Sequence, residues 1–370
     1  MKLFTSAVLG AVSAVALLAA STSAFAKDEI TPQEKKLIEA AKKEGQVTLI
    51  NPIFQEKTAE NFQAAFRKRY GLGEEFKFNN LRKGTGATIA QVQQEIKAGK
   101  FTVDAHIVNA PGFFDEAAKR GAWLELDSGQ WKHHEKLVKK AGQYSNYPYV
   151  VTPLAYTFQP IWNASCPGME NVSINSYEDA LSPSLKGKTI MSDLTKSATY
   201  TNTSIALSRA GVLKLDDLWA KSKAQEPAIE FRTEAKRQMV IACERPVDMW
   251  NITGRVLQAE QADPTLKGKL KFGVYKDGQV MLGNQLAVLK GAPNPNAGKL
   301  LVEFMLTTEG ADAYVADEVL YTFREGYTPP EVARPYMFDL EKTKLVGMED
   351  WVSAQQEFKA VREKWQTYFQ

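Results

Sequence analysis

The chain has 370 residues, of which 44% are hydrophobic and 24% charged, a composition that excludes a disordered protein. Its formal net charge is +3 with both signs evenly mixed, which argues against nucleic acid as a partner because phosphate binding needs a concentrated basic surface. Beyond the amino terminus no apolar run approaches the length of a membrane span, so we do not expect an integral membrane protein. This length is too great for one hydrophobic core and predicts two domains.

Residues 1–26 have the pattern of a secretory signal peptide. They carry one charge, Lys2, followed by the apolar run 7–20 and a small-x-small exit at Ala24-Phe25-Ala26. Cleavage there leaves 344 residues with a net charge of +2. The first cysteine of the chain is Cys166, so none stands at the cleavage point to take a lipid anchor, and we expect a soluble product.

Strands alternate with helices along the first part of the chain. Thr31 and Glu34 have the spacing of a capping box that begins a helix through Lys43, and Gly45 ends it. The pattern then predicts strands at 46–51, 76–81 and 103–108 and helices at 57–70, 87–98 and 113–120. Such alternation is typical of an α/β fold in which parallel sheets are covered by helices.

A Tyr- and Pro-rich stretch at 144–153 interrupts this pattern and is our candidate domain junction. A second strand–helix series follows it. Strands are predicted at 154–162, 189–191, 239–243, 269–274 and 285–289, and helices at 201–210, 295–306 and 348–368.

The sequence contains no recognisable motif for catalysis or metal binding. There is no Gly-x-Ser-x-Gly elbow and no His-Glu-x-x-His. His106 lies in a predicted strand, and His133 and His134 are neighbours that point in different directions, so we expect a solvated helix face there and no metal site. We predict no catalytic residues and no cofactor.

Two cysteines in an exported chain allow one disulfide. Cys166 lies in a loop-like stretch and Cys243 ends an apolar run. Pairing requires α-carbons within about 7 Å of each other, which the sequence does not show. The sequence therefore leaves undecided whether the two cysteines form a disulfide.

Hydroxyl and amide side chains gather where predicted strands give way to helices. Residues 192–202 hold Thr195, Ser197 and Thr199 between a strand and a helix, and 82–86 have the same placement. Free N–H groups at a helix start, together with hydroxyls, bind anions well, although Ser and Thr in such places also act as plain helix caps. Asn51 and Asn109 end two more strands, and ligands of open α/β sheets bind beyond strand carboxyl ends.

Five stretches, in this order behind a signal peptide, resemble the periplasmic solute-binding proteins of bacterial ABC importers, specifically the ferric-iron/putrescine/phosphonate group. The resemblance covers about 37–330. The stretches are LIEAAKKEGQV at 37–47, AAFRKRYG at 64–71, Val103-Asp104, NSYEDALSPSLKGKT at 175–189, and GAPNPNA at 291–297 with Phe304 and 308–310.

The resemblance implies a type II fold of two α/β lobes joined by a hinge and closing on a ligand in the cleft. The chain would cross between lobes near 155–162 and return near 284–289. Lobe 1 would then comprise 27–155 plus 285–335, and lobe 2 would comprise 156–284 plus 336–370. The implied function is capture of a small solute in the periplasm by a monomer, without catalysis, and delivery to permease and ATPase subunits in the inner membrane.

Iron-binding members of that group carry a Tyr pair soon after the strand that corresponds to 239–243. Residues 243–251 of this chain contain none. Glu244 and Asp248 could supply oxygen ligands, but Arg245 beside them would repel Fe³⁺. This departure favours an organic anion such as a carboxylate or phosphonate, which Arg245 could clamp, although Arg245 could equally form an ion pair with Glu244 or Asp248.

Placement at strand ends and the resemblance together predict the residues that line the cleft. They are Asn51, Thr85, Asn109, Thr195, Ser197, Thr199, Tyr200 and Arg245. Trp250 could stack on the ligand, but core packing is the simpler interpretation. The alternatives are a ferric-iron-binding protein, a sensor that signals to a separate receptor, and an exported enzyme on the same fold.

Overall fold

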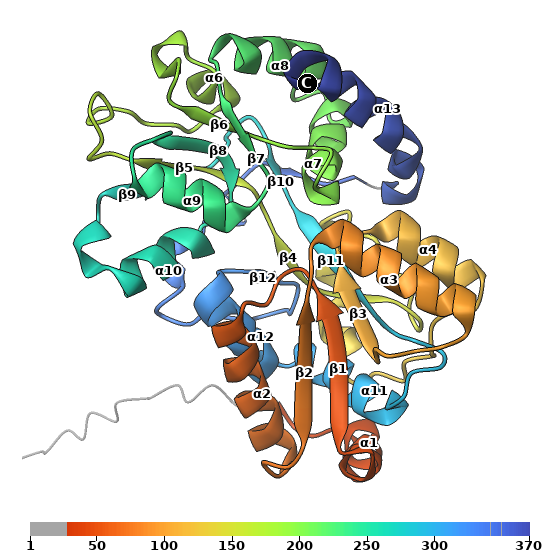
Figure 1. The fold of residues 1–370 in the computed structure, drawn as a ribbon. Helices are drawn as coiled ribbons and strands as arrows, with labels where there is room; N and C mark the ends of the chain where they lie inside the picture. The colour runs from red at the N-terminus through yellow and green to blue at the C-terminus, as the bar shows by residue number, and fades with distance from the viewer. Residues whose placement is uncertain (1–27, 341, 349) are drawn as a thin grey trace, which may run out of the picture.

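The computed structural model describes residues 28–340, 342–348 and 350–370, and the signal-peptide prediction lies outside these residues. The described chain forms two layered α/β units, each a sheet flanked by helices (Figure 1). We call the six-stranded sheet and its helices lobe 1 and the five-stranded sheet and its helices lobe 2. The predicted α/β class is confirmed.

Lobe 1 is built on a mixed sheet with the strand order β12-β4-β11-β3-β1-β2. β1 pairs in parallel with β2 and β3, whereas β11 runs antiparallel to both β3 and β4. The strands are β1 (Gln46–Asn51), β2 (Lys77–Arg82), β3 (Ala105–Val108), β4 (Val151–Tyr156), β11 (Leu282–Val288) and β12 (Tyr321–Thr322).

The helices of lobe 1 cover both faces of this sheet. They are α1 (Pro32–Glu44), α2 (Glu56–Tyr70), α3 (Thr85–Ala98), α4 (Pro111–Lys119), α5 (Glu135–Lys140), α11 (Pro295–Met305) and α12 (Thr308–Glu318). The predicted capping box of α1 forms, with Thr31 and Glu34 each accepting from the other's backbone N–H. Rings of Phe62 and Phe66 pack edge-on against Phe304, with centroids 4.8 and 5.4 Å away, and join α2 to α11 in the core.

Lobe 2 has the strand order β7-β6-β8-β5-β9, with β6 parallel to β7 and β8 and the remaining pairs antiparallel. Trp219, Trp250 and Trp365 are buried in its core. Its strands are β5 (Gln159–Asn163), β6 (Thr189–Ser192), β7 (Ala228–Glu230), β8 (Val247–Asn251) and β9 (Leu270–Phe272), and its helices are α6 (Tyr177–Ala180), α7 (Ala198–Arg209), α8 (Leu215–Ala224), α9 (Thr233–Ile241) and α10 (Gly254–Ala262). Four single-turn 3₁₀ helices span Trp131–His133, Pro183–Leu185, Pro264–Leu266 and Arg334–Tyr336.

The chain passes between the two sheets more than once. β4 belongs to lobe 1 and β5 to lobe 2, so the first crossing is at Thr157 and Phe158. β10 (Gln279–Val280) pairs with β13 (Leu345–Val346) just before the chain returns as β11. The stretch 144–153 does not mark the crossing, because Val151 already pairs within lobe 1.

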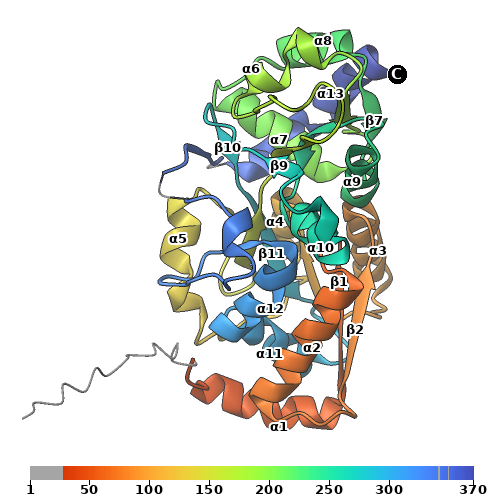
Figure 2. The same ribbon diagram turned by 90° about the vertical axis from the view of Figure 1, so that its left-hand side faces the viewer.

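The carboxyl-terminal helix α13 (Trp351–Phe369) touches both lobes. It packs on α7 and α8 of lobe 2 and also on α4 of lobe 1 (Figure 1). On another side of the molecule α10 of lobe 2 lies against α12 of lobe 1 (Figure 2). The two lobes therefore meet through several helix contacts, which also include α3 of lobe 1 with α7 of lobe 2.

Two local predictions were wrong. Residues 239–241 end helix α9 instead of forming a strand, because a short apolar run does not distinguish a strand from a buried helix face, and here Lys236 and Val240 face the core one turn apart. His134 is buried, not solvated, and its Nε2 lies 2.8 Å from the carbonyl oxygen of Leu306.

Cys166 and Cys243 form a disulfide, with their α-carbons 5.6 Å apart. The bridge ties the loop after β5 to the end of α9 and settles the alternative that the sequence left open. It closes a segment 77 residues long within lobe 2.

Replacing both cysteines by serine is expected to lower the free energy of unfolding by about 2–4 kcal/mol, because the bridge restricts the unfolded chain over a long loop. Urea denaturation followed by circular dichroism measures this loss. A reducing agent should give the same loss in the wild type and have no effect on the double variant. Equal stability of wild type and variant would contradict the expectation.

Glu303 of α11 in lobe 1 makes the stability of the protein depend on pH. Burial raises the pKa of its carboxyl to about 7, with the nearby charge of Glu34 adding to the rise. The folded protein then keeps a proton that the unfolded chain releases above about pH 4.5, so stability falls as the pH rises from 4.5 to 7. Urea unfolding at pH 5 and pH 8 should show Glu303→Gln losing about 2.5 kcal/mol less than wild type over this interval. Identical losses in the two proteins would contradict this assignment.

Candidate functional site

The carboxyl ends of strands from both lobes face each other across the gap between them. β1 and β2 of lobe 1 and β6, β7 and β8 of lobe 2 all end at one cavity of about 160 Å³, which we call the interlobe cleft. Its lining residues are Pro52, Ile53, Arg82, Gly84, Thr85, Tyr156, Phe158, Lys196, Ser197, Thr199, Tyr200, Phe231, Arg232, Thr233, Glu234, Ile252, Arg255 and Leu320.

Three helices begin at this cleft. The residues that precede α3, α7 and α9 are Gly84, Ser197 and Arg232, and none of these three residues caps its helix with its own side chain. The first-turn N–H groups and the positive ends of the helix dipoles are directed toward the same small space. Such an arrangement favours an anion.

Charged side chains reinforce this preference. Arg82, Lys196, Arg232 and Arg255 line the cleft together with a single carboxylate, Glu234. Glu234 lies 2.6 Å from Arg82 and 3.4 Å from Arg255, and it therefore links lobe 1 to lobe 2. Burial opposes ionisation of Glu234, but the two guanidinium groups outweigh it and hold its pKa at about 2.

The other cations have partial partners. Arg255 also lies 2.8 Å from Glu318 of lobe 1, and Arg232 lies 3.2 Å from Glu230. Lys196 is exposed at the cleft. The cleft consequently carries more positive than negative charge even after its ion pairs are counted.

Four of the residues predicted from the sequence line the cleft: Thr85, Ser197, Thr199 and Tyr200. The hydroxyls of Ser197 and Thr199 lie 2.9 Å apart. The Tyr200 hydroxyl donates to the carbonyl oxygen of Phe231 at 3.2 Å, and its ring covers the ammonium of Lys236 at 4.7 Å. Trp250 is core, as the simpler interpretation held, and stacks on Tyr200 with centroids 6.2 Å apart.

Asn51 and Thr195 shape the loops beside the cleft. The Asn51 side chain accepts from the backbone N–H groups of Ile53 and Phe54 at 2.9 and 2.7 Å. The Thr195 hydroxyl donates to Asp193 at 2.6 Å. Neither side chain lines the cavity, so these two act on the position of their neighbours.

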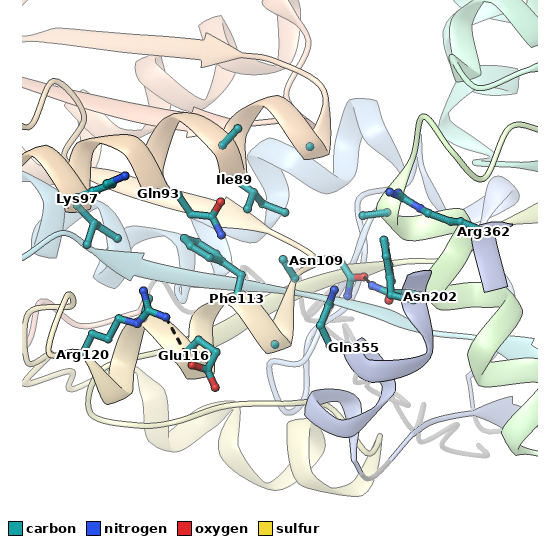
Figure 3. Close-up of a pocket in the computed structure, with 18 residues that line it drawn as sticks. Ile89, Gln93, Lys97, Asn109, Phe113, Glu116, Arg120, Asn202, Gln355 and Arg362 are labelled. Carbon is teal, nitrogen blue, oxygen red and sulfur yellow. Dashed lines mark hydrogen bonds and ion pairs between the residues drawn. The ribbon is translucent and has the colours of Figure 1, made fainter. Parts of the chain in front are cut away.

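Asn109 lines a different and larger cavity on the other side of the first turns of α3 and α7. It accepts a hydrogen bond from Asn202 Nδ2 at 2.8 Å and donates to the carbonyl oxygen of Gly283 at 2.6 Å. The bond to Asn202 joins lobe 1 to lobe 2 (Figure 3).

Arg245 requires a correction. It precedes β8, at the opposite edge of the lobe 2 sheet from the cleft, and its guanidinium donates to the carbonyl oxygen of Gly187 at 2.5 Å. The error follows from placing the strand at 239–243, which put Arg245 after a strand instead of before one. Neither proposed partner, Glu244 or Asp248, pairs with it; Asp248 pairs with the buried Lys236 at 3.0 Å.

The sequence reasoning missed Arg82, Lys196, Arg232, Glu234 and Arg255. Arg82 ends β2, and Lys196 lies in the loop between β6 and α7. Both belong to the stretches 82–86 and 192–202, whose hydroxyls suggested a ligand site, so the positive charge of these stretches could have been used as well. Glu234 and Arg232 follow β7, a three-residue strand too short to predict. Arg255 lies in the first turn of α10, beyond the true end of β8.

Among residues 28–340, 342–348 and 350–370 no three His, Cys, Asp or Glu side chains are grouped so as to hold a metal ion. Within the same residues no helix is both long enough and apolar enough to cross a bilayer.

Solved structures with this architecture are two-lobed periplasmic binding proteins. The periplasmic binding protein AfuA from Actinobacillus pleuropneumoniae, solved with fructose-6-phosphate, superposes with a TM-score of 0.69 at 18% identity, over 87% of this chain and 98% of that one. Iron-bound HitA from Pseudomonas aeruginosa superposes with a TM-score of 0.67 at 15% identity, over 86% of this chain and 99% of that one. The substrate-binding protein of an ABC transporter from Agrobacterium tumefaciens superposes with a TM-score of 0.70 at 13% identity, over 87% of this chain and 95% of that one.

These likenesses define the fold as the type II periplasmic-binding-protein fold expected from the sequence. The model of the bacterial extracellular solute-binding protein family matches residues 57–336, and the chain belongs to that family. A search of curated protein sequences gave no significant match.

Proposed function

We propose that the protein is exported to the periplasm after cleavage behind Ala26 and captures a small organic anion, a carboxylate or phosphonate, in the interlobe cleft. It works as a monomer without catalytic activity or cofactor. It delivers the ligand to the permease and ATPase subunits of an ABC importer. Membership of the extracellular solute-binding family supports the binding role.

The observation that carries the choice of ligand is the excess of positive charge in the cleft. Four cationic side chains and three helix starts surround one carboxylate, Glu234. An anionic ligand group can replace Glu234 between Arg82 and Arg255, and guanidinium groups bind carboxylate and phosphonate oxygens in a bidentate manner. A cavity of about 160 Å³ suits a small acid.

Ferric ion suits the same residues less well. Fe³⁺ is a hard cation that prefers charged oxygen ligands, and the cleft supplies Glu234, Tyr156 and Tyr200. Burial raises the pKa of both tyrosines, which opposes the phenolate form. The guanidinium groups on either side of Glu234 would repel a trivalent cation. Iron remains the second candidate ligand only because the fold is similar to that of iron-bound HitA.

A thermal-shift screen tests the proposal. Organic carboxylates, phosphonates, inorganic phosphate and ferric citrate are offered to the protein, and a ligand at a hundredfold excess over its Kd stabilises the fold by about 2.7 kcal/mol. We expect organic anions to raise the melting temperature. A rise with ferric citrate, and none with citrate alone or with any other anion, would overturn the choice of ligand.

Two arginines at opposite ends of β8 give a matched pair of variants. Arg255→Gln is expected to weaken binding of the best anion from the screen at least tenfold in calorimetric titration, because it removes a buried cation from the cleft. Arg245→Gln removes the same charge from the far edge of the sheet and should leave the affinity within twofold. Equal effects of the two substitutions would contradict the assigned cleft.

A further inference from the structure

A cavity larger than the interlobe cleft has no role in the function proposed above. Its volume is about 760 Å³, and it lies beyond the first turns of α3 and α7 from the interlobe cleft. Lobe 1 contributes α3 and α4, and lobe 2 contributes α7 and α13 (Figure 3). Small-molecule sites in proteins commonly have volumes of about 300–1,000 Å³.

The walls of this cavity are apolar in the middle. Ile89 of α3, Phe113 of α4 and Phe358 of α13 are all only partly buried and line it. Figure 3 shows Phe113 and Ile89 between the charged side chains at either end of the cavity. An apolar surface that remains accessible in a concave site is favourable for an apolar ligand body.

Cationic side chains stand at both ends. Lys97 and Arg120 lie at one end and Arg362 at the other (Figure 3). The carboxylate that lines the cavity is Glu116, and it lies 3.3 Å from Lys119 and 4.0 Å from Arg120. The charge of the cavity is therefore net positive.

Arg362 is a partly buried cation of this cavity that has no carboxylate partner within ion-pair distance among the described residues. Its Nε donates to the hydroxyl of Thr201 at 3.1 Å, and its guanidinium lies 4.2 Å from the centre of the Phe358 ring. No carboxylate of the described residues forms an ion pair with it, although Asp193 attracts it from farther away. Burial lowers the pKa of this guanidinium, which reflects a charge partly removed from water and not fully paired.

We propose that this cavity is a second ligand site, which takes an amphipathic organic anion whose apolar body lies against Ile89, Phe113 and Phe358 and whose acidic group pairs with Arg362. Arginine forms its strongest pairs with carboxylate, sulfonate-like and phosphate oxygens in partly desolvated places. The site is separate from the interlobe cleft and does not depend on the identity of the ligand there.

The second site is complete only when the lobes are together. Its two walls belong to different lobes, and the hydrogen bond between Asn109 and Asn202 joins them at its edge. A ligand that bridges both walls stabilises the closed arrangement, which also forms the interlobe cleft. By linkage, such a ligand raises the affinity of the cleft for its own anion, and the reverse holds equally.

The probe for this site is 8-anilinonaphthalene-1-sulfonate, an aromatic anion that fluoresces when it leaves water. We expect saturable binding to the folded protein, and competition by octanoate but not by 1-octanol. Arg362→Gln should weaken probe binding about tenfold. Lys359→Gln removes the same charge from an exposed position of α13 and should leave binding unchanged. Equal effects of the two substitutions, or equal competition by octanol, would overturn the proposal.

A second pair of variants blocks the cavity sterically and tests the site even if Arg362→Gln fails to fold. Ala90 is exposed on α3 and lines the cavity, whereas Ala87 is exposed on the same helix and does not. Ala90→Trp should abolish probe binding while Ala87→Trp preserves it, with both melting temperatures near that of the wild type. Probe binding that survives Ala90→Trp would overturn the proposal.

Arg255→Gln separates the two sites. Probe binding should persist in this variant even though its cleft binds anions poorly. Loss of probe binding in Arg255→Gln, with no effect of Arg362→Gln, would place the probe in the interlobe cleft and would overturn the second site while supporting the first.

Discussion

The carboxylate of Glu234 joins the two lobes at the cleft, next to the buried interlobe pair of Arg255 with Glu318. It lies between Arg82 of lobe 1 and Arg255 of lobe 2, in a space that three helix starts already make positive. Removing it without replacement would leave two guanidinium groups facing each other with less compensation, which is costly in a partly desolvated place. A ligand anion that takes its position satisfies the same requirement. In the function proposed above, the two guanidinium groups that hold Glu234 are also the groups that bind the ligand anion.

The topology explains why this charge gathers at one place. The chain crosses from β4 to β5 and returns at β11, so the two sheets present their parallel-strand carboxyl ends to each other. α3, α7 and α9 follow such strand ends and begin at the gap. Residues as distant in sequence as Arg82 and Arg255 meet there without any further local signal.

The sequence predicted the α/β class, most helices and the hydroxyl-bearing turns, because periodic burial and the strand-to-helix position of Thr85 and Ser197 are local properties. It did not predict the charged half of the cleft. Arg245 was predicted, and Arg255 was missed, because the apolar run at 239–243 is equally compatible with a strand and with a helix face. Glu234 follows a strand of three residues, and its two arginine partners come from other elements, one of them in the other lobe. Such contacts are set by tertiary structure alone.

The bridge between Cys166 and Cys243 also fixes where lobe 2 acquires its final form. Cys243 directly follows the last turns of α9, the helix whose first turn bears Thr233 and Glu234 at the cleft. A reducing cytosol keeps the two thiols apart, whereas an oxidising compartment joins them. Copies that remain inside the cell therefore have a helix anchored at one fewer point than exported copies. Formation of this anchor is in this way tied to the redox state of the compartment that holds the protein.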